Sequence, residues 1–108
     1  MPSSQADTVS YLQAQSAAQE LAGACRALWL ATLSLMTAYM QNPAPAHRLL
    51  LARRIARNLD TLSGQECFSS RCREKFVRLS ERWQLRGEEG DAKLGLHPSL
   101  RNALRSLL

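Results

Sequence analysis

The sequence predicts an all-α protein, a small helical bundle of three main helices followed by a short C-terminal helix. Apolar residues recur at intervals of three and four along most of the 108 residues, which is the period of one helical face. No run alternates between apolar and polar residues as a half-buried strand does. The five glycines and four prolines fall mainly between these periodic segments. We therefore expect a single helical domain over residues 1–108.

The first helix is expected over residues 4–41. Ser4 is a suitable N-cap with an acid three residues later, and Asn42-Pro43 ends the helical pattern. A continuous helix of this length spans roughly 55 Å, whereas a compact domain of this size has a radius of gyration of about 13 Å. The helix must therefore bend near Gly23, project from the body of the protein, or pack along a second subunit.

The second half of this helix is apolar on two sides. One stripe consists of Leu21, Cys25, Leu28, Leu35 and Tyr39, and the other of Trp29, Leu33, Met36 and Met40. A helix that is apolar nearly all round is central in a bundle, shared between subunits, or embedded in a membrane. The uncharged run over residues 27–41 is shorter than the ~20 residues that a bilayer span needs, so we expect no membrane span.

The second helix is expected over residues 43–62, with prolines at its start and Ser63-Gly64 as a left-handed stop. Its inward face consists of Leu51, Ala52, Ile55, Leu59 and Leu62. Arg48 projects into this apolar sector, where its long side chain can snorkel or meet a carboxylate. Leu50 projects into the basic sector on the opposite side, so it is either exposed or covered by another chain.

The third helix is expected over residues 70–86, with Ser69 as its N-cap. Its apolar stripe, which we expect to be buried, consists of Cys72, Phe76, Leu79 and Trp83. Residues 87–98, GEEGDAKLGLHP, are typical of a linker. A short leucine-rich helix is expected over residues 99–108, and it must dock on other protein because ten residues are too few for a stable isolated helix.

The cysteines, an odd count of three, suit a reducing compartment better than a secreted disulfide scaffold. The N-terminal residues lack the basic and then apolar regions of a secretory signal, so we expect a cytoplasmic protein. Cys67 and Cys72 do not have the spacing of a redox or zinc motif. Cys67 precedes a helix start near two arginines and is the thiol most open to reaction.

Motifs that specify a chemistry are missing from the sequence. It contains no glycine-rich phosphate loop, no G-x-S-x-G and no H-E-x-x-H. The two histidines have no spacing that brings them to a cysteine or an acid, and Glu88-Glu89 lies in the expected linker. We therefore expect neither enzymatic activity nor a metal or cofactor.

The charge distribution leaves a nucleic-acid-binding function open as an alternative. The chain carries a formal net charge of +5, and residues 44–86 hold ten lysines and arginines against four acids. A phosphate-binding surface would use the basic faces of the second and third helices, formed by Arg53, Arg54, Arg57, Arg71, Lys75, Arg78 and Arg82. The connection between these helices is longer than the ~3–4 residue turn of a helix-turn-helix, and Glu74 and Glu81 interleave with the cations.

An excess of apolar surface favours a different function, that of a small helical protein–protein interaction or regulatory protein. A chain of this length has limited means to cover a first helix that is apolar on two sides, an apolar residue in a basic sector and a leucine-rich tail. We expect a homodimer built on the first helix, or a module for another protein. The predicted association residues are Leu28, Trp29, Leu33, Met36, Met40, Leu50, Leu104, Leu107 and Leu108.

Overall fold

A computed structural model describes the backbone of residues 2–94 and the side chains of residues 5–90. Three helices make up nearly all of this part of the chain, which contains no strand: α1 (Pro2–Gln41), α2 (Pro45–Ser63) and α3 (Ser70–Leu94). The predicted all-α class is confirmed. The short helix predicted over residues 99–108 lies outside the described residues.

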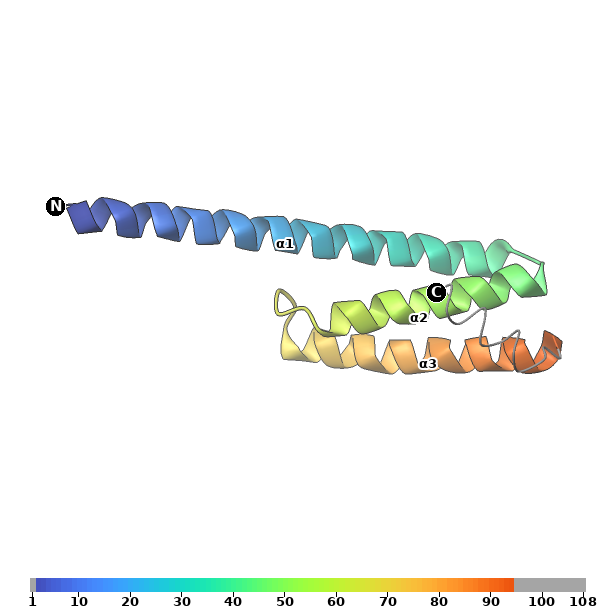
Figure 1. Ribbon diagram of the computed structural model, residues 1–108. Helices are drawn as coiled ribbons and strands as arrows, with labels where there is room; N and C mark the ends of the chain where they lie inside the picture. Colours follow the sequence, from blue (N-terminus) through green and yellow to red (C-terminus); the bar gives the residue numbers. More distant parts are fainter. Residues whose placement is uncertain (1, 95–108) are drawn as a thin grey trace.

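The three helices differ in length, and this decides the shape of the molecule. α2 and α3 form an antiparallel hairpin, and the second half of α1 runs alongside it in the direction opposite to α2 (Figure 1). The first half of α1 extends past the end of the hairpin. The structure measures 70 × 26 × 21 Å with a radius of gyration of 19.1 Å. α1 continues through Gly23 without interruption. Of the alternatives drawn from the sequence, the helix therefore projects from the body of the protein and does not bend at Gly23.

The turn between α1 and α2 is held by polar contacts. The Asn42 side-chain oxygen accepts a hydrogen bond from the Ala44 backbone N–H (2.9 Å), and Pro45 opens α2. Arg48 Nη1 donates to the carbonyl oxygens of Tyr39 (2.7 Å) and Asn42 (3.3 Å). Its guanidinium lies 4.1 Å from the centre of the Tyr39 ring. Arg48 therefore satisfies the carbonyls at the end of α1 rather than meeting a carboxylate.

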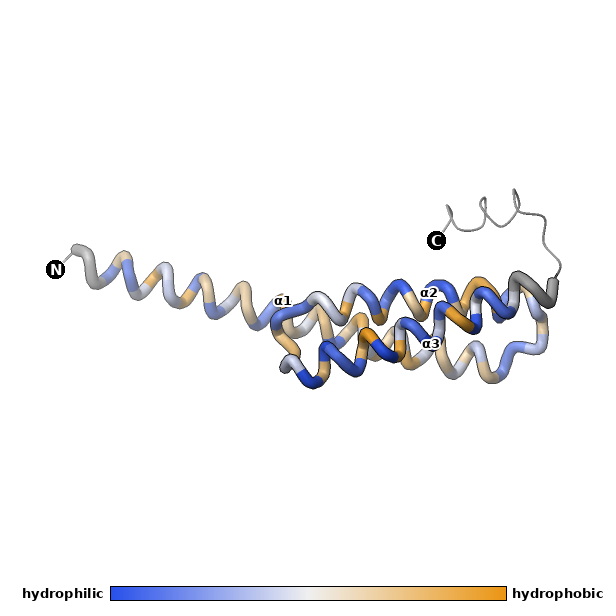
Figure 2. Tube along the Cα trace, turned by 90° about the horizontal axis from the view of Figure 1, so that it is seen from below, coloured by the Kyte–Doolittle hydropathy of each residue, from blue (hydrophilic) through white to orange (hydrophobic). Residues whose placement is uncertain are grey.

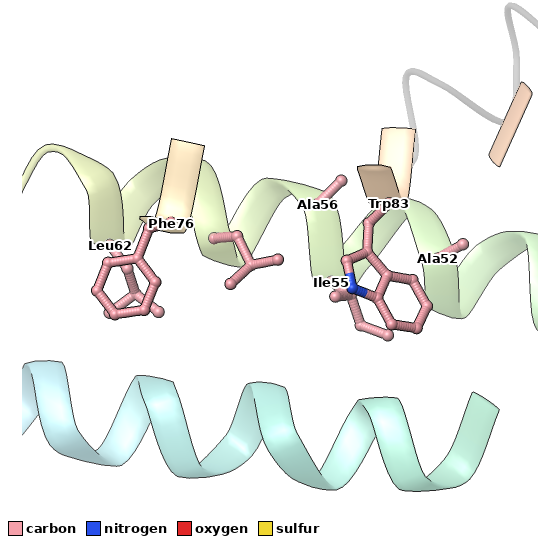
Figure 3. Close-up of a cluster of buried hydrophobic side chains, with 7 residues drawn as sticks. Ala52, Ile55, Ala56, Leu62, Phe76 and Trp83 are labelled. Atoms are coloured by element: carbon pink, nitrogen blue, oxygen red, sulfur yellow. The ribbon is translucent and has the colours of Figure 1, made fainter. Parts of the chain in front are cut away.

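The core lies where all three helices meet. Its buried residues are Ala52, Ile55, Ala56, Leu59, Leu62, Phe76 and Trp83 (Figure 3). Edge-to-face ring contacts join α1 to α3, with centroid separations of 5.2 Å for Trp29–Phe76 and 4.9 Å for Tyr39–Trp83. The predicted inward face of α2 is confirmed at four of its five positions, and the fifth, Leu51, is half-buried.

Two predictions for α3 are wrong. The helix continues through residues 87–94, which we expected to be linker, because two glycines of this segment lie against α2. A Cβ at Gly87 would lie 3.2 Å from Arg53 Cγ, and one at Gly90 would lie 3.2 Å from Leu49 Cδ1. Cys72 is exposed rather than buried. It sits in the first turn of α3, where Phe68 of the connecting loop packs beside Phe76 (5.0 Å).

The end of α2 also differs from expectation. Gly64 has φ −91° and ψ 0°, which is right-handed backbone, so the predicted left-handed stop is wrong. Its N–H donates to the Thr61 carbonyl oxygen (3.2 Å) in a tightened last turn. The loop that follows, residues 64–69, forms the end of the hairpin nearest the projecting half of α1.

Candidate interaction surface

The most exposed feature of the described residues is the projecting half of α1, residues 5–24, which we call the arm. Each side chain from Gln5 to Leu21 is exposed, and from Gln5 onward the first buried side chain of α1 is Cys25. Figure 2 shows the arm standing clear of the hairpin, with apolar and hydrophilic positions mixed along it. Large apolar side chains lie open on it: Val9, Tyr11, Leu12 and Leu21, with exposed fractions of 54, 67, 56 and 46%.

One apolar stripe runs along α1 from the arm into the bundle. Its residues recur at alternating intervals of three and four: Tyr11, Ala14, Ala18, Leu21, Cys25, Leu28, Thr32, Leu35 and Tyr39. We call this stripe the seam. From Cys25 onward the seam faces the hairpin, since Cys25 and Thr32 are buried and Leu28, Leu35 and Tyr39 are half-buried. Its first four residues are exposed, so the same surface is covered in one half of α1 and bare in the other.

The predicted association residues divide into two groups. Leu28, Trp29 and Met36 pack on the core, and Leu50 is half-buried. Leu33 and Met40 are exposed on the outer side of α1, together with Leu30, which sequence reasoning missed. The three leucines of the tail lie outside the described residues. The arm residues were missed too, although extending the three-and-four spacing toward the N-terminus would have found them.

The predicted basic residues do not all share one face. Ser80 Oγ donates to the Ala56 carbonyl oxygen (3.0 Å), which marks the side of α3 that meets α2. At about 100° per residue, the α3 cations lie roughly 140–180° around the helix from Ser80. These exposed cations are Arg71, Lys75, Arg78 and Arg82. On α2, Arg54 and Arg57 are exposed, whereas Arg53 is half-buried beside Gly87 of α3. The α3 row therefore points away from α2.

Two thiols meet where the arm leaves the bundle. Cys25 of α1 is buried, whereas Cys67 in the loop before α3 is exposed. A hydrogen bond with the Cys67 side chain, followed by burial and the neighbouring Cys67 charge, raises the pKa of the Cys25 thiol. The third thiol, Cys72, is exposed. Sequence spacing gave no sign of this pair, because it depends on α1 lying along the hairpin.

A cavity of about 260 Å³ lies at the opposite end of the bundle, beside the α1–α2 turn. Tyr39, Arg48, Arg86 and Glu89 line it together with two prolines, Leu49 and Gly90. Both guanidiniums lie over aromatic rings, with Arg86 4.6 Å from the centre of the Trp83 ring. Arg48 donates its hydrogen bonds to backbone carbonyls, so the role of this corner is to hold the turn.

Within residues 5–90 no group of three or more histidine, cysteine, aspartate or glutamate side chains is placed to hold a metal ion. By length and composition alone, the segment Gln5–Gln41 of α1 is apolar enough to cross a membrane. The core helix of a soluble protein passes the same test, so this finding by itself decides nothing.

Comparison with known proteins adds no assignment: no family model, no curated protein and no solved structure matches the chain.

Proposed function

We propose that this protein is a small, non-enzymatic helical interaction protein that docks another polypeptide chain through α1 and acts as a homo-oligomer or partner-binding module. The observation that carries the proposal is the arm, a run of 20 residues of continuous helix whose side chains from Gln5 to Leu21 are all exposed. An isolated helix of this length is marginal in water, and its stability in proteins comes mostly from packing one apolar face. The arm has such a face but no partner for it within the described residues.

The outer side of α1 supports the same proposal. Leu30, Leu33 and Met40 are exposed on the half of α1 that is docked on the hairpin, so apolar surface continues along the whole helix. Single exposed apolar residues are common on soluble proteins, but on α1 exposed large apolar side chains recur from Val9 to Met40. Burying these side chains against another helix removes apolar area from water and stabilises the complex.

A polypeptide partner fits the arm better than a lipid bilayer. The arm carries the acids Asp7 and Glu20 and four glutamines, so polar groups surround its apolar stripe. The most apolar run of α1, residues 27–41, is the part whose inner side already packs on the hairpin. Transfer of this helix into a bilayer would uncover the core formed by Phe76 and Trp83.

Amide hydrogen exchange combined with mass in solution tests the proposal. Between about 1 and 200 µM we expect the mass to rise above the 12.0 kDa of one chain, with protection of the arm amides rising in parallel. A constant 12.0 kDa mass with an arm that exchanges as fast as an unfolded chain would contradict self-association. Arm protection that requires lipid vesicles would assign α1 to a membrane instead.

A second candidate function, nucleic-acid binding, is favoured by one observation. Arg71, Lys75, Arg78 and Arg82 are all exposed along one side of α3, which points away from α2. Four cations in a row at helical spacing suit contact with a phosphate backbone, which gives affinity that falls steeply with salt. This hypothesis is narrower than the one drawn from the sequence, because it uses the four cations of α3 and not all seven predicted cations.

Two double variants of equal charge separate this candidate from non-specific attraction. Arg78→Glu with Arg82→Glu reverses two charges of the α3 row, and Arg54→Glu with Arg57→Glu reverses two exposed charges on α2. If α3 contacts phosphate, the double variant on α3 should bind mixed DNA or RNA at low salt at least ~10-fold more weakly than the double variant on α2. Equal losses would indicate net charge alone, and no binding by the unsubstituted chain removes the candidate.

A further inference from the structure

We propose that the bare part of the seam, Tyr11, Ala14, Ala18 and Leu21, pairs in antiparallel orientation with the same residues of a second copy of this chain. This inference rests on the proposed interaction function and adds to it the partner, the surface and the direction. Four observations carry it: the continuity of the seam, the reach of the chain's own elements, the position of the hairpin, and the order of residue sizes.

Continuity of the seam shows what kind of surface its bare part is. From Cys25 to Tyr39 the stripe is already a helix–helix interface, which the rings of Phe76 and Trp83 complete from α3. The spacing of three and four continues without a break to Tyr11. A stripe with this mean spacing of 3.5 residues shifts by only about 20° around an α-helix every seven residues, so a neighbouring helix can follow it with a gentle supercoil. The bare part is therefore the continuation of an interface, and helical protein is the occupant it fits.

The described elements of the same chain do not reach this surface. α2 has 19 residues against 40 in α1, so it covers about 28 Å of a helix that is about 60 Å long. α3 ends at Leu94 beside the α1–α2 turn, roughly 40 Å along α1 from Ala14 and Ala18 (Figure 1). Within residues 2–94, therefore, neither α2 nor α3 lies against the bare part of the seam, which leaves this surface open to a second chain.

The hairpin decides the direction of pairing. It occupies the space beside the seam from Cys25 onward, which is where a parallel second α1 would continue. A parallel pair on this surface would force two hairpins into one volume. In an antiparallel pair each hairpin lies beyond the bare seam of the other copy, and only residues 2–6 of that copy pass beside the hairpin. A two-fold axis perpendicular to the helices relates the two chains.

The bare seam is also complementary to itself. Read in either direction, its residues are large, small, small and large, so an antiparallel copy places Tyr11 opposite Leu21 and Ala14 opposite Ala18. The small alanine pairs let the two helix backbones approach closely at the centre of the contact. The larger Tyr11–Leu21 pairs fill the space between the helices at both ends. The same register brings Asp7 of one copy to the level of Cys25 in the other, next to the exposed Arg26 of α1. The opposite charges of Asp7 and Arg26 therefore favour this direction too.

Two substitutions of equal chemistry on opposite sides of the arm test the surface. Ala18→Glu puts a carboxylate into the seam, and Ser16→Glu puts one on the far side of the same exposed helix. Both sites are remote from the core, so the monomer folds in each case. A pairing of about 20 residues lies at the low end of specific interfaces, for which we expect micromolar dissociation constants. Light scattering should show the unsubstituted chain and Ser16→Glu as dimers of twice 12.0 kDa, and Ala18→Glu weakened at least ~30-fold.

Other outcomes separate this inference from the proposed function. If Ala18→Glu stays dimeric and Leu33→Glu dissociates the dimer, the outer side of α1 is the interface, and the seam pairing is wrong while the interaction function stands. If the unsubstituted chain remains at 12.0 kDa up to about 200 µM, the pairing with a second copy is overturned. A second protein that protects the arm would then be the only support left for the interaction function.

A distance between spin labels tests the direction. Val77 is exposed on α3, close to the level of residue 31 on α1 because Phe76 contacts Trp29. In a cysteine-free background, labels at Val77→Cys in the two copies of an antiparallel dimer lie about 45 Å apart at 1.5 Å per residue. A distance under about 25 Å would indicate side-by-side hairpins and overturn the antiparallel arrangement.

Discussion

The two halves of α1 have the same stripe but different surroundings. In the docked half, residues 25–41, the seam contacts α2 and α3, and rings from three elements meet around Phe76. In the arm the stripe continues with the same spacing, and every one of its side chains is exposed. Tyr11 and Trp29 make the contrast concrete, because they lie 18 residues, or five helical turns, apart on the same side of the helix.

The difference between the halves shows that coverage depends on helix length. α2 and the loop after it end at the level of Cys25, so nothing in the described chain is left to cover the arm. A periodic apolar stripe indicates which side of a helix packs against another element, but not whether that element belongs to the same chain. For this reason the docked half contributes to the stability of the domain, and the arm is the part through which we propose that the protein associates.

The largest expected difference comes from removing an aromatic side chain in each half. Trp29→Ala should lower the free energy of unfolding by about 2–4 kcal/mol, because it removes the edge-to-face contact with Phe76 and leaves a cavity. Tyr11→Ala should lower it by less than about 0.5 kcal/mol in dilute solution, since its side chain is 67% exposed. Urea unfolding below about 1 µM measures both. Comparable losses would mean that the arm folds against the hairpin.

Arg48 offers the next largest effect, at the turn that fixes α1 on the hairpin. Arg48→Met keeps much of the apolar stem but removes the hydrogen bonds to the Tyr39 and Asn42 carbonyls. We expect a loss of about 1–2 kcal/mol in urea unfolding. Arg48→Lys should recover only part of it, because an ammonium cannot reproduce the planar fork over the Tyr39 ring. Full recovery by lysine would show that charge alone holds the turn.

One substitution made at two glycines compares an open site with a packed one. At Gly23 the nearest atom to an added Cβ is Arg26 Nη2 at 4.0 Å, so Gly23→Ala should raise stability by about 0.5–1 kcal/mol through helix propensity. At Gly90 the added Cβ would lie 3.2 Å from Leu49 Cδ1, and Leu49 is buried. Gly90→Ala should therefore lower the melting temperature while Gly23→Ala raises it. Equal gains at both sites would mean that α3 does not pack closely on α2.

The smallest expected effects concern the thiols at the junction of the two halves. Cys67 and Cys72 are exposed and should react with iodoacetamide near pH 8, whereas Cys25 should react at least ~10-fold more slowly because it is buried with a raised pKa. The folded chain holds the Cys25 proton to higher pH than the unfolded chain. Its small contribution to stability is thus complete below about pH 9, the ordinary value being 9.0, and is lost as the pH rises further.

Mass spectrometry of the alkylated chain distinguishes the three thiols. Cys72 is the control, because it is exposed like Cys67. Mild oxidation should join Cys25 to Cys67 before either is joined to Cys72, since their side chains already share a hydrogen bond. A preference for Cys67–Cys72 would contradict the docking of α1 at this end of the hairpin.

Periodicity within one helix was enough to predict much of this protein. The all-α class, the ends of α1 within two residues, and the burial of Ile55, Leu59 and Leu62 depend on local spacing and on Pro and Asn at the turn. These features follow from backbone geometry and side-chain alternation, which the sequence carries directly. The predicted association residues Leu33 and Met40 are exposed for the same reason, since they lie off the side that packs.

Tertiary contacts decided the rest. Gly87 and Gly90 are common in linkers, but here they let α3 pass close to Arg53 and Leu49, so the helix continues where the composition predicted its end. Cys72 lies on the apolar stripe of α3 and is nevertheless exposed. The spacing within one helix does not show which part of its apolar side another helix covers. The sequence by itself determined the helices and their apolar sides; only the arrangement of unequal helices decided that half of one side would be left bare.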